Sequence, residues 1–130
     1  MKKKILRECL EIAKSNNNSN HPQWECYHHF SFIVQRNKIV GMGTNRMASS
    51  LTFLGYQPYS KMHSETDVYF KVKGIMAKNC DFEVVNIRLT KTFMIKSSEP
   101  CKCCFAFLNN MGCKRIWFTT NTGNFAHISF

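Results

Sequence analysis

The spacing of apolar residues changes from one segment of the chain to the next, and this change limits the folds that the chain can adopt. Residues 3–14 carry apolar side chains at helical spacing, whereas residues 28–35 alternate in the manner of a β-strand. Arg36 and Asn37 read as a tight turn into a second predicted strand over residues 38–42. The chain is therefore predicted to begin with a helix that is followed by a β-hairpin.

After the loop over residues 43–58, helices and strands alternate. The predicted elements are a helix over 64–77, a strand over 82–89, a helix from Pro100 that ends at Gly112, and strands over 115–119 and 125–130. Single helices between strands favour a mixed sheet with helices on its faces. The last connection is too short for a crossover helix, which predicts a C-terminal antiparallel hairpin. A length of 130 residues fits a single domain over residues 1–130.

The composition bears on where the protein works. No segment approaches the roughly 20 apolar residues of a membrane span, and the basic N-terminus lacks the apolar core of a secretory signal. We expect no membrane association and a location in the cytoplasm or in the interior of a host cell. In such a reducing compartment, seven cysteines indicate metal binding or buried thiols rather than disulfides. Five of them are expected to be small buried residues: Cys9, Cys26, Cys80, Cys103 and Cys113.

A net charge of +10 indicates an anionic partner such as nucleic acid. However, 13 of the 18 basic residues are lysines and the chain has 12 asparagines, a pairing that an A/T-rich genome also produces. Arginine, which is suited to bidentate contacts with phosphates and bases, is scarce. Charge alone therefore leaves both interpretations open.

Two short segments have the residue types of a catalytic metal site. His63-Ser64-Glu65 and Pro100-Cys101-Lys102-Cys103-Cys104 each lie at the predicted N-terminus of a helix. Residues three apart share a helix face, so Cys101 and Cys104 present both sulfurs on one side, and the helix dipole favours their thiolate form. With His63 as a third ligand, zinc keeps its fourth position for water, as catalytic zinc does.

Glu65 lies two residues after the histidine, within reach of that water. A carboxylate there takes a proton from the water and passes it to a ring nitrogen and a departing amine, which is hydrolytic deamination. Cys103 is the competing ligand, because Cys-x-Cys-Cys offers other pairs. Residues two apart point to different helix faces, which favours Cys101 with Cys104.

The order H-x-E…P-C-x-x-C is the pattern of zinc-dependent nucleobase deaminases, and the chain resembles the cytidine deaminase-like superfamily over nearly its whole length. The resemblance implies a three-layer α/β fold, in which a five-stranded mixed sheet has helices on both faces. Asn45, after the second predicted strand, resembles the family asparagine that contacts the ribose. By the same analogy, the backbone N–H groups of Ser64 and Cys101 face the substrate.

Details of the resemblance indicate different substrate classes. A histidine at position 63, where nucleoside deaminases usually have cysteine, resembles deoxycytidylate, tRNA adenosine and polynucleotide deaminases. The predicted terminal hairpin instead resembles the branch that holds nucleoside cytidine deaminases and toxin deaminases. We expect conversion of cytosine to uracil in a nucleotide or a single-stranded polynucleotide, with adenosine or guanine as the alternative base.

Several aromatic residues flank the predicted active-site end and either stack on a base or pack within the fold; they are Trp24, His28, His29 and Tyr56. A different class of function is a non-catalytic, zinc-stabilised module that binds nucleic acid. An intact Glu65 argues against that class. The family ranges from monomers to tetramers, so a homo-oligomer is an open possibility.

Overall fold

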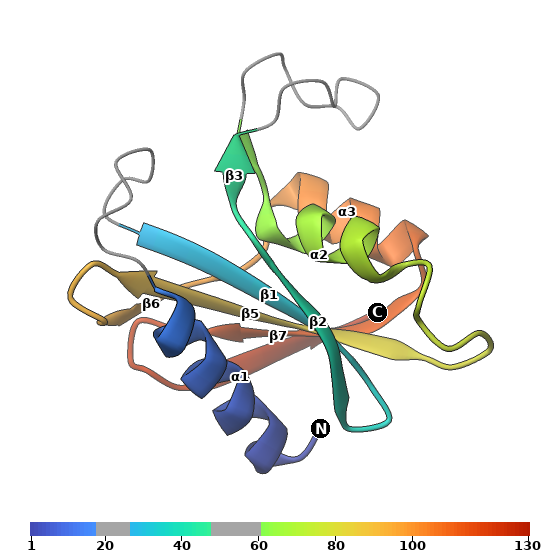
Figure 1. Ribbon diagram of the computed structural model, residues 1–130, viewed down its shortest axis with the longest axis horizontal. Coiled ribbons are helices and arrows are strands. Elements are labelled where there is room, and N and C mark those ends of the chain that lie inside the picture. The colour runs from blue at the N-terminus through green and yellow to red at the C-terminus, as the bar shows by residue number, and fades with distance from the viewer. Residues whose placement is uncertain (18–26, 48–60) are drawn as a thin grey trace.

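The computed structural model describes residues 1–17, 27–47 and 61–130, and the loop predicted over 43–58 lies largely outside them. Figure 1 shows a twisted sheet with helices on both sides. The elements in chain order are α1 (Lys3–Asn16), β1 (Tyr27–Gln35), β2 (Lys38–Thr44), β3 (Arg46–Met47), β4 (Lys61–Met62), α2 (Ser64–Val72), β5 (Phe82–Thr90), β6 (Ile95–Lys96), α3 (Lys102–Asn110), β7 (Cys113–Thr119) and β8 (Phe125–Ser129). No helix among these is long and apolar enough to cross a bilayer.

The main sheet has the strand order β2-β1-β5-β7-β8, and β6 pairs with the end of β5. The β5–β7 pair, which α3 connects, is parallel, and the other neighbours are antiparallel. The sheet is therefore mixed, and the predicted C-terminal hairpin is confirmed. Arg36 and Asn37 both have positive φ, as a two-residue type I′ turn between β1 and β2 requires.

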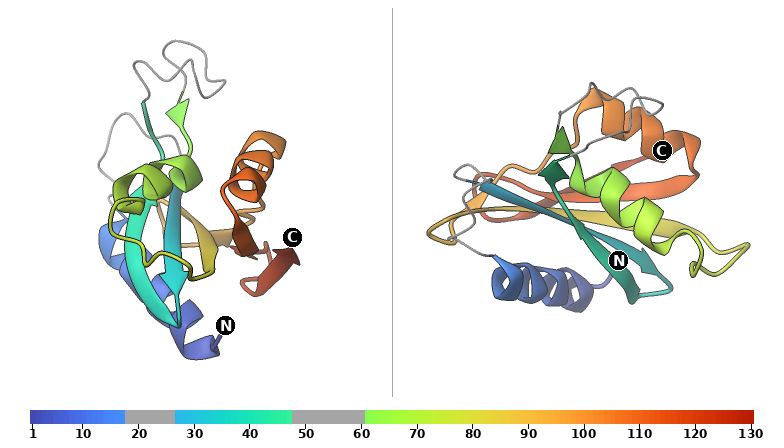
Figure 2. Two further views of the ribbon diagram at one scale, coloured as in Figure 1. Left: turned by 90° about the vertical axis from the view of Figure 1, so that its right-hand side faces the viewer. Right: turned by 45° about the horizontal axis from the view of Figure 1, so that its top comes forward.

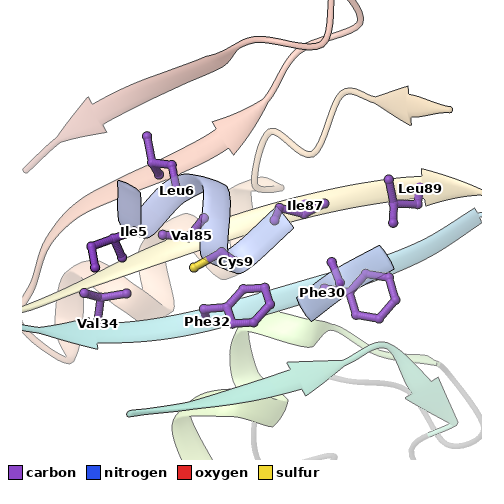
Figure 3. Packing of buried hydrophobic residues seen from close by; sticks show 10 residues of the cluster. Ile5, Leu6, Cys9, Phe30, Phe32, Val34, Val85, Ile87 and Leu89 are labelled. Carbon is purple, nitrogen blue, oxygen red and sulfur yellow. The ribbon is translucent and has the colours of Figure 1, made fainter. Parts of the chain in front are cut away.

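Strand alternation divides the apolar residues into two cores, one on each face of the sheet. Helix α1 covers one face, and α2 and α3 cover the other (Figure 2). Figure 3 shows the α1 core, where Cys9 packs among side chains that alternate along β1 and β5. The second core includes Ile33, Val84 and Leu108, which are fully buried. These two layers of helices around one sheet are the predicted three-layer architecture.

Two predictions about helices were wrong in detail. The helix predicted over 64–77 ends at Val72, because Gly74 follows and the amides of Ile75 and Met76 both turn back to the Val72 carbonyl. Ile75, expected on the buried helix face, is 70% exposed. Pro100 lies just before α3, because the N-cap of that helix is Cys101.

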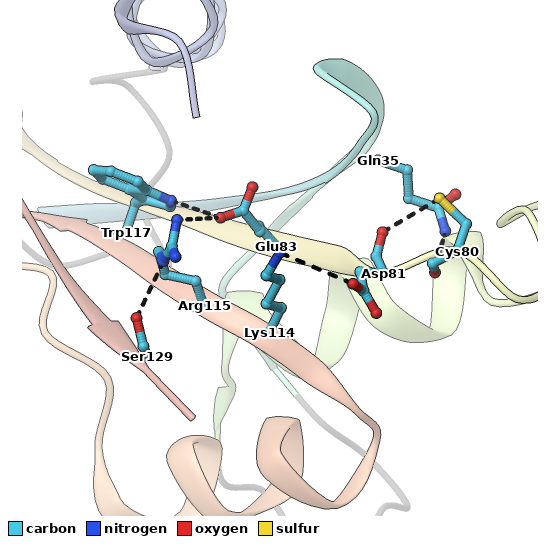
Figure 4. A network of polar contacts seen from close by, with 8 residues as sticks. All are labelled: Gln35, Cys80, Asp81, Glu83, Lys114, Arg115, Trp117 and Ser129. Atoms are coloured by element: carbon cyan, nitrogen blue, oxygen red, sulfur yellow. Dashed lines mark hydrogen bonds and ion pairs between the residues drawn. The ribbon is translucent and has the colours of Figure 1, made fainter.

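A polar network joins neighbouring strands at the end of the sheet where β5 and β7 begin (Figure 4). Glu83 of β5 accepts hydrogen bonds from the Trp117 indole at 3.2 Å and from Arg115 at 3.4 Å, and both donors lie on β7. Gln35, at the end of β1, donates to the carbonyls of Ala77 and Cys80. The Glu83 contacts join β5 to β7, and the Gln35 contacts hold the connection between α2 and β5. This connection lies at the end of the sheet opposite to the first turn of α2.

Strand β2 passes α2 so closely that only glycine fits at position 43. A Cβ built there would overlap the backbone nitrogen of Val68 and lie 2.8 Å from both the Ser64 carbonyl oxygen and the Val68 Cα. These are backbone atoms, so the helix itself would have to move. The close approach fixes the first turn of α2 against the sheet.

We expect Gly43→Ala to lower the free energy of unfolding by about 3 kcal/mol, at the upper end of overpacking costs. Urea denaturation measures the change. Gly74→Ala is the matched control, because a Cβ added at Gly74 would have no described atom within 4 Å, and we expect a change of at most about 1 kcal/mol. Equal stability of the two variants would contradict the close approach.

Candidate active site

The first turns of α2 and α3 meet on one face of the sheet. His63 is the N-cap of α2 and Cys101 the N-cap of α3, and both have extended backbone conformations. His63 Nδ1 lies 3.1 Å from Cys104 Sγ and 3.4 Å from Cys101 Sγ. The ligand atoms of all three residues lie within 4.8 Å of one another. The structure thus brings together the three residues that the sequence predicted as metal ligands.

Local helix geometry explains why two cysteines three residues apart converge. The Cys101 side chain caps α3 by accepting a hydrogen bond from the Cys104 backbone amide, with an N–Sγ distance of 3.5 Å. That bond places the N-cap sulfur over the first turn, on the side from which Cys104 also projects. Cys104 is buried, whereas Cys103 is exposed and is not part of the group.

The donor set fits zinc. One imidazole nitrogen and two thiolates are ligands that zinc takes in catalytic sites, and oxygen-seeking cations such as magnesium do not favour them. Two ligands of a tetrahedral zinc are roughly 3.5 Å apart at ordinary bond lengths, close to the nitrogen–sulfur distances found here. The residues present can therefore hold zinc without a change of fold.

Glu65 is buried in the first turn of α2, with 6% of its surface exposed. Its Oε2 accepts a hydrogen bond from the Asn86 side-chain amide at 3.1 Å, and its Oε1 lies 3.2 Å from the Ser64 hydroxyl. The Ser31 hydroxyl contacts both Ser64 and Asn86 at 2.7 Å. The predicted acid/base residue thus lies in a polar pocket between the sheet and α2.

Sequence reasoning missed Ser31 and Asn86. Both are almost fully buried, and both interrupt runs of apolar residues in β1 and β5. Single polar residues inside predicted buried strands were the signal that would have found them, because such a group needs a partner in the interior. The sequence does not show that the partner is Glu65, since the strands and α2 meet only in the folded chain.

The loop that leads to Cys101 is anchored by a second buried pair. The Ser98 hydroxyl donates to the Asn86 carbonyl at 2.8 Å and accepts from the Thr119 amide at 2.8 Å. The Ser98 amide in turn donates to the Thr119 carbonyl at 2.9 Å. These bonds attach the loop that precedes Cys101 to strands β5 and β7.

The residues predicted to contact substrate lie in different places. Asn45 follows β2, and its Oδ1 accepts from the His29 backbone amide at 3.0 Å. The Ser64 side chain is buried in the polar pocket beside Glu65. His28 shares the α1 face of β1 with Phe30 and contacts Asn17, so the structure does not bring it to the cysteines. Trp24 and Tyr56 lie outside the described residues.

Asp67 joins the Asn45 region to α2. Its buried carboxylate accepts from the Thr44 backbone amide at 3.0 Å and pairs with Lys71 at 2.9 Å. The end of β2, immediately before Asn45, is therefore tied to the helix that begins with the predicted ligand His63. This tie holds Asn45 at the same end of the sheet as the three-residue group.

Comparison with known proteins supports the fold. No protein-family model matches the sequence, and no curated protein matches it. Solved structures do match: the cytidine deaminase from Burkholderia pseudomallei is 15% identical with a TM-score of 0.63, covering 99% of this chain and 93% of that chain. The apo dCMP deaminase from the cyanophage S-TIM5 is 16% identical with a TM-score of 0.59, covering 89% and 82%.

The same cyanophage enzyme in complex with dCMP and dUMP matches at 17% identity, with a TM-score of 0.58 and coverage of 89% and 81%. At these identities the likeness establishes the fold. The chain has the cytidine deaminase-like fold, and the fold-level resemblance found in the sequence is confirmed.

The described cysteines differ in burial. Burial raises the pKa of Cys9 to about 12, and it raises the pKa of Cys113 to about 12 as well. Because only the thiolate is a nucleophile, these two thiols stay protonated and inert up to strongly alkaline pH. Cys101 and Cys103 are exposed to solvent.

We expect iodoacetamide at pH 8 to alkylate Cys101 and Cys103 in the metal-free native protein and to spare Cys9 and Cys113. Peptide mass mapping after quenching identifies the modified residues. Full alkylation in denaturant is the control for accessibility. Modification of Cys9 as fast as Cys103 in the folded protein would contradict the burial described here.

Proposed function

We propose that this protein is a zinc-dependent hydrolytic deaminase that converts cytosine to uracil in a nucleotide or a single-stranded polynucleotide. The observation that carries the proposal is the meeting of two helix N-termini, which groups one imidazole and two thiols within 4.8 Å. Glu65 is buried in the same first turn of α2. The cytidine and dCMP deaminases that share the fold support cytosine as the base and a nucleotide as one form of the substrate.

The reaction replaces the exocyclic amine of the base by an oxygen from water. His63, Cys101 and Cys104 would hold the zinc, which when bound supplies a Lewis acid that makes water nucleophilic at neutral pH. The C–N bond breaks, a C=O bond forms, and ammonia leaves. One proton of the water ends on the ring nitrogen and the other on the departing ammonia.

Glu65 moves these protons. A carboxylate beside the attacking water acts first as a general base and then as a general acid. Its burial supports this role, because a water-excluded site strengthens each electrostatic interaction with the reacting groups. The donors on Asn86 and Ser64 compensate the cost of burying the carboxylate.

Asn45 is proposed to contact the ribose, as the family resemblance implies. The bond from the His29 amide to Asn45 Oδ1 supports the proposal, since it orients the side chain while the Nδ2 amide is the group that donates to a sugar hydroxyl. The net charge of +10 suits an anionic substrate.

We expect one zinc ion per chain, which elemental analysis of the purified protein measures. Cys104→Ser and Cys101→Ser should each lose most of the zinc and unfold at lower temperature, because metal binding contributes to folding. Cys103→Ser is the matched control and should keep its zinc. Loss of zinc from Cys103→Ser, with retention in Cys104→Ser, would assign the ligand to Cys103.

Glu65→Gln should lower kcat by about a thousandfold or more, because the isosteric amide cannot accept the proton. Zinc content and melting temperature should stay close to those of the wild type. The measurement is loss of the amino group from a matched panel, with Glu65→Gln as the blank: cytidine, deoxycytidine, their monophosphates, single-stranded DNA and RNA, adenosine and guanine.

The panel also decides the substrate. Turnover of polymers alone would indicate that the basic charge contributes to binding nucleic acid. Turnover of nucleotides alone would indicate that the charge reflects the composition of an A/T-rich genome. Deamination of adenosine or guanine would show that the substrate base is a purine and not cytosine. Full activity of Glu65→Gln would contradict the mechanism, and a zinc-loaded wild type that deaminates nothing would favour a non-catalytic module.

A further inference from the structure

Asn86 occupies the centre of the polar pocket and contacts both halves of the candidate site. It lies on β5, on the face that packs against α2 and α3, and is 3% exposed. One side-chain N–H donates to Glu65 Oε2 at 3.1 Å, and the other to the Ser98 carbonyl at 3.4 Å. Its Oδ1 accepts from the Ser31 hydroxyl at 2.7 Å. All of its side-chain hydrogen-bonding groups are thus engaged.

The surroundings permit one orientation of this amide. Glu65 Oε2 and the Ser98 carbonyl oxygen accept hydrogen bonds and cannot donate when the carboxylate is ionised. Turning the amide over would put Oδ1 against both of these oxygens and lose two hydrogen bonds. Asn86 therefore presents its donors to the carboxylate and to the loop that precedes Cys101.

The hydroxyl protons of the pocket can be assigned from the same contacts. Ser31 has one proton, and its short contact with Asn86 Oδ1 uses it, because that oxygen only accepts. Ser64 can rotate its single proton either to Ser31 at 2.7 Å or to Glu65 Oε1 at 3.2 Å. Ser64 is a partner that can both donate and accept, whereas Asn86 Nδ2 can only donate.

The two oxygens of Glu65 are therefore not equivalent. Oε2 faces a fixed donor, which leaves no place for a proton along that contact. Oε1 faces a hydroxyl that donates to the ionised carboxylate and accepts from the protonated one.

We infer that Asn86 is the positioning residue for Glu65: its amide anchors Oε2 and so fixes the orientation in which the carboxylate acts during deamination. This inference rests on the function proposed above. Because the same amide holds the Ser98 carbonyl, three residues before Cys101, it also fixes the carboxylate relative to the loop that carries a predicted metal ligand. Small displacements of an acid/base group slow the chemical step without weakening substrate binding.

The test compares variants of buried polar residues on adjoining strands. Asn86→Leu removes both donors at similar volume and should lower kcat by about 10- to 100-fold, as loss of outer-shell support does in other metal sites. KM should stay within about threefold, because the lost interaction acts in the transition state. Ser31→Ala removes only the hydroxyl that holds Asn86 Oδ1, and a smaller loss of kcat, about threefold to tenfold, is expected.

Gln35→Leu is the matched control. Gln35 is also buried and polar, and its amide holds the Ala77 and Cys80 backbone at the other end of the sheet, away from Glu65. This variant should lose stability while the folded fraction keeps kcat within about twofold. All rates are normalised to zinc content and to the folded fraction measured by circular dichroism.

A double-mutant cycle separates positioning from general destabilisation. In the Glu65→Gln background, Asn86→Leu should lower the residual rate by less than about threefold, because the group it positions is already disabled. Unchanged kcat in Asn86→Leu would overturn the inference and leave the proposed function standing. If that variant does not fold, unchanged kcat in Ser31→Ala overturns the inference in its place. A zinc-loaded wild type without deaminase activity would overturn both.

Discussion

A carboxylate held in the interior is the constraint on which the rest of this structure depends. Glu65 lies between the sheet and α2, where an unpaired charge would be costly. The apolar runs of β1 and β5 are each interrupted by one buried polar residue, so that Asn86 donates a hydrogen bond to the carboxylate and Ser31 in turn holds Asn86. The packing of α2 on the sheet and the surroundings of Glu65 are therefore built from the same contacts.

The N-termini of α2 and α3 are a second feature on which the candidate site depends. Each first turn leaves backbone amides without helical partners and carries a partial positive charge. At α3, the Cys101 sulfur accepts a hydrogen bond from one of these amides. At α2, the acidic residues Glu65 and Asp67 lie in the first turn. The glycine at position 43 lets β2 approach α2 closely enough to hold that turn in place. The two cysteines predicted as ligands and the predicted acid/base residue thus lie where the backbone favours negative charge.

The sequence allowed most of the fold to be predicted because apolar periodicity depends on local geometry. The order of the main elements and the mixed sheet were correct, and the tight turn at Arg36 and Asn37 was placed correctly. The end of α2 was predicted too late, because Ile75 fits a helical spacing but follows a glycine and turns out to solvent. The short strands β3, β4 and β6 were missed, since two-residue pairings leave no periodic signal.

The sequence by itself determined which residues have the chemistry of a metal site, because a three-residue spacing at the start of a helix puts Cys101 and Cys104 on one side of it whatever its surroundings. It also determined that the site would have a carboxylate two residues from His63. Only the tertiary structure decided that the two helix N-termini face each other, and that Asn86 supports the carboxylate. Those contacts join residues far apart in the chain, and their distances depend on how strands and helices pack, which no local pattern records.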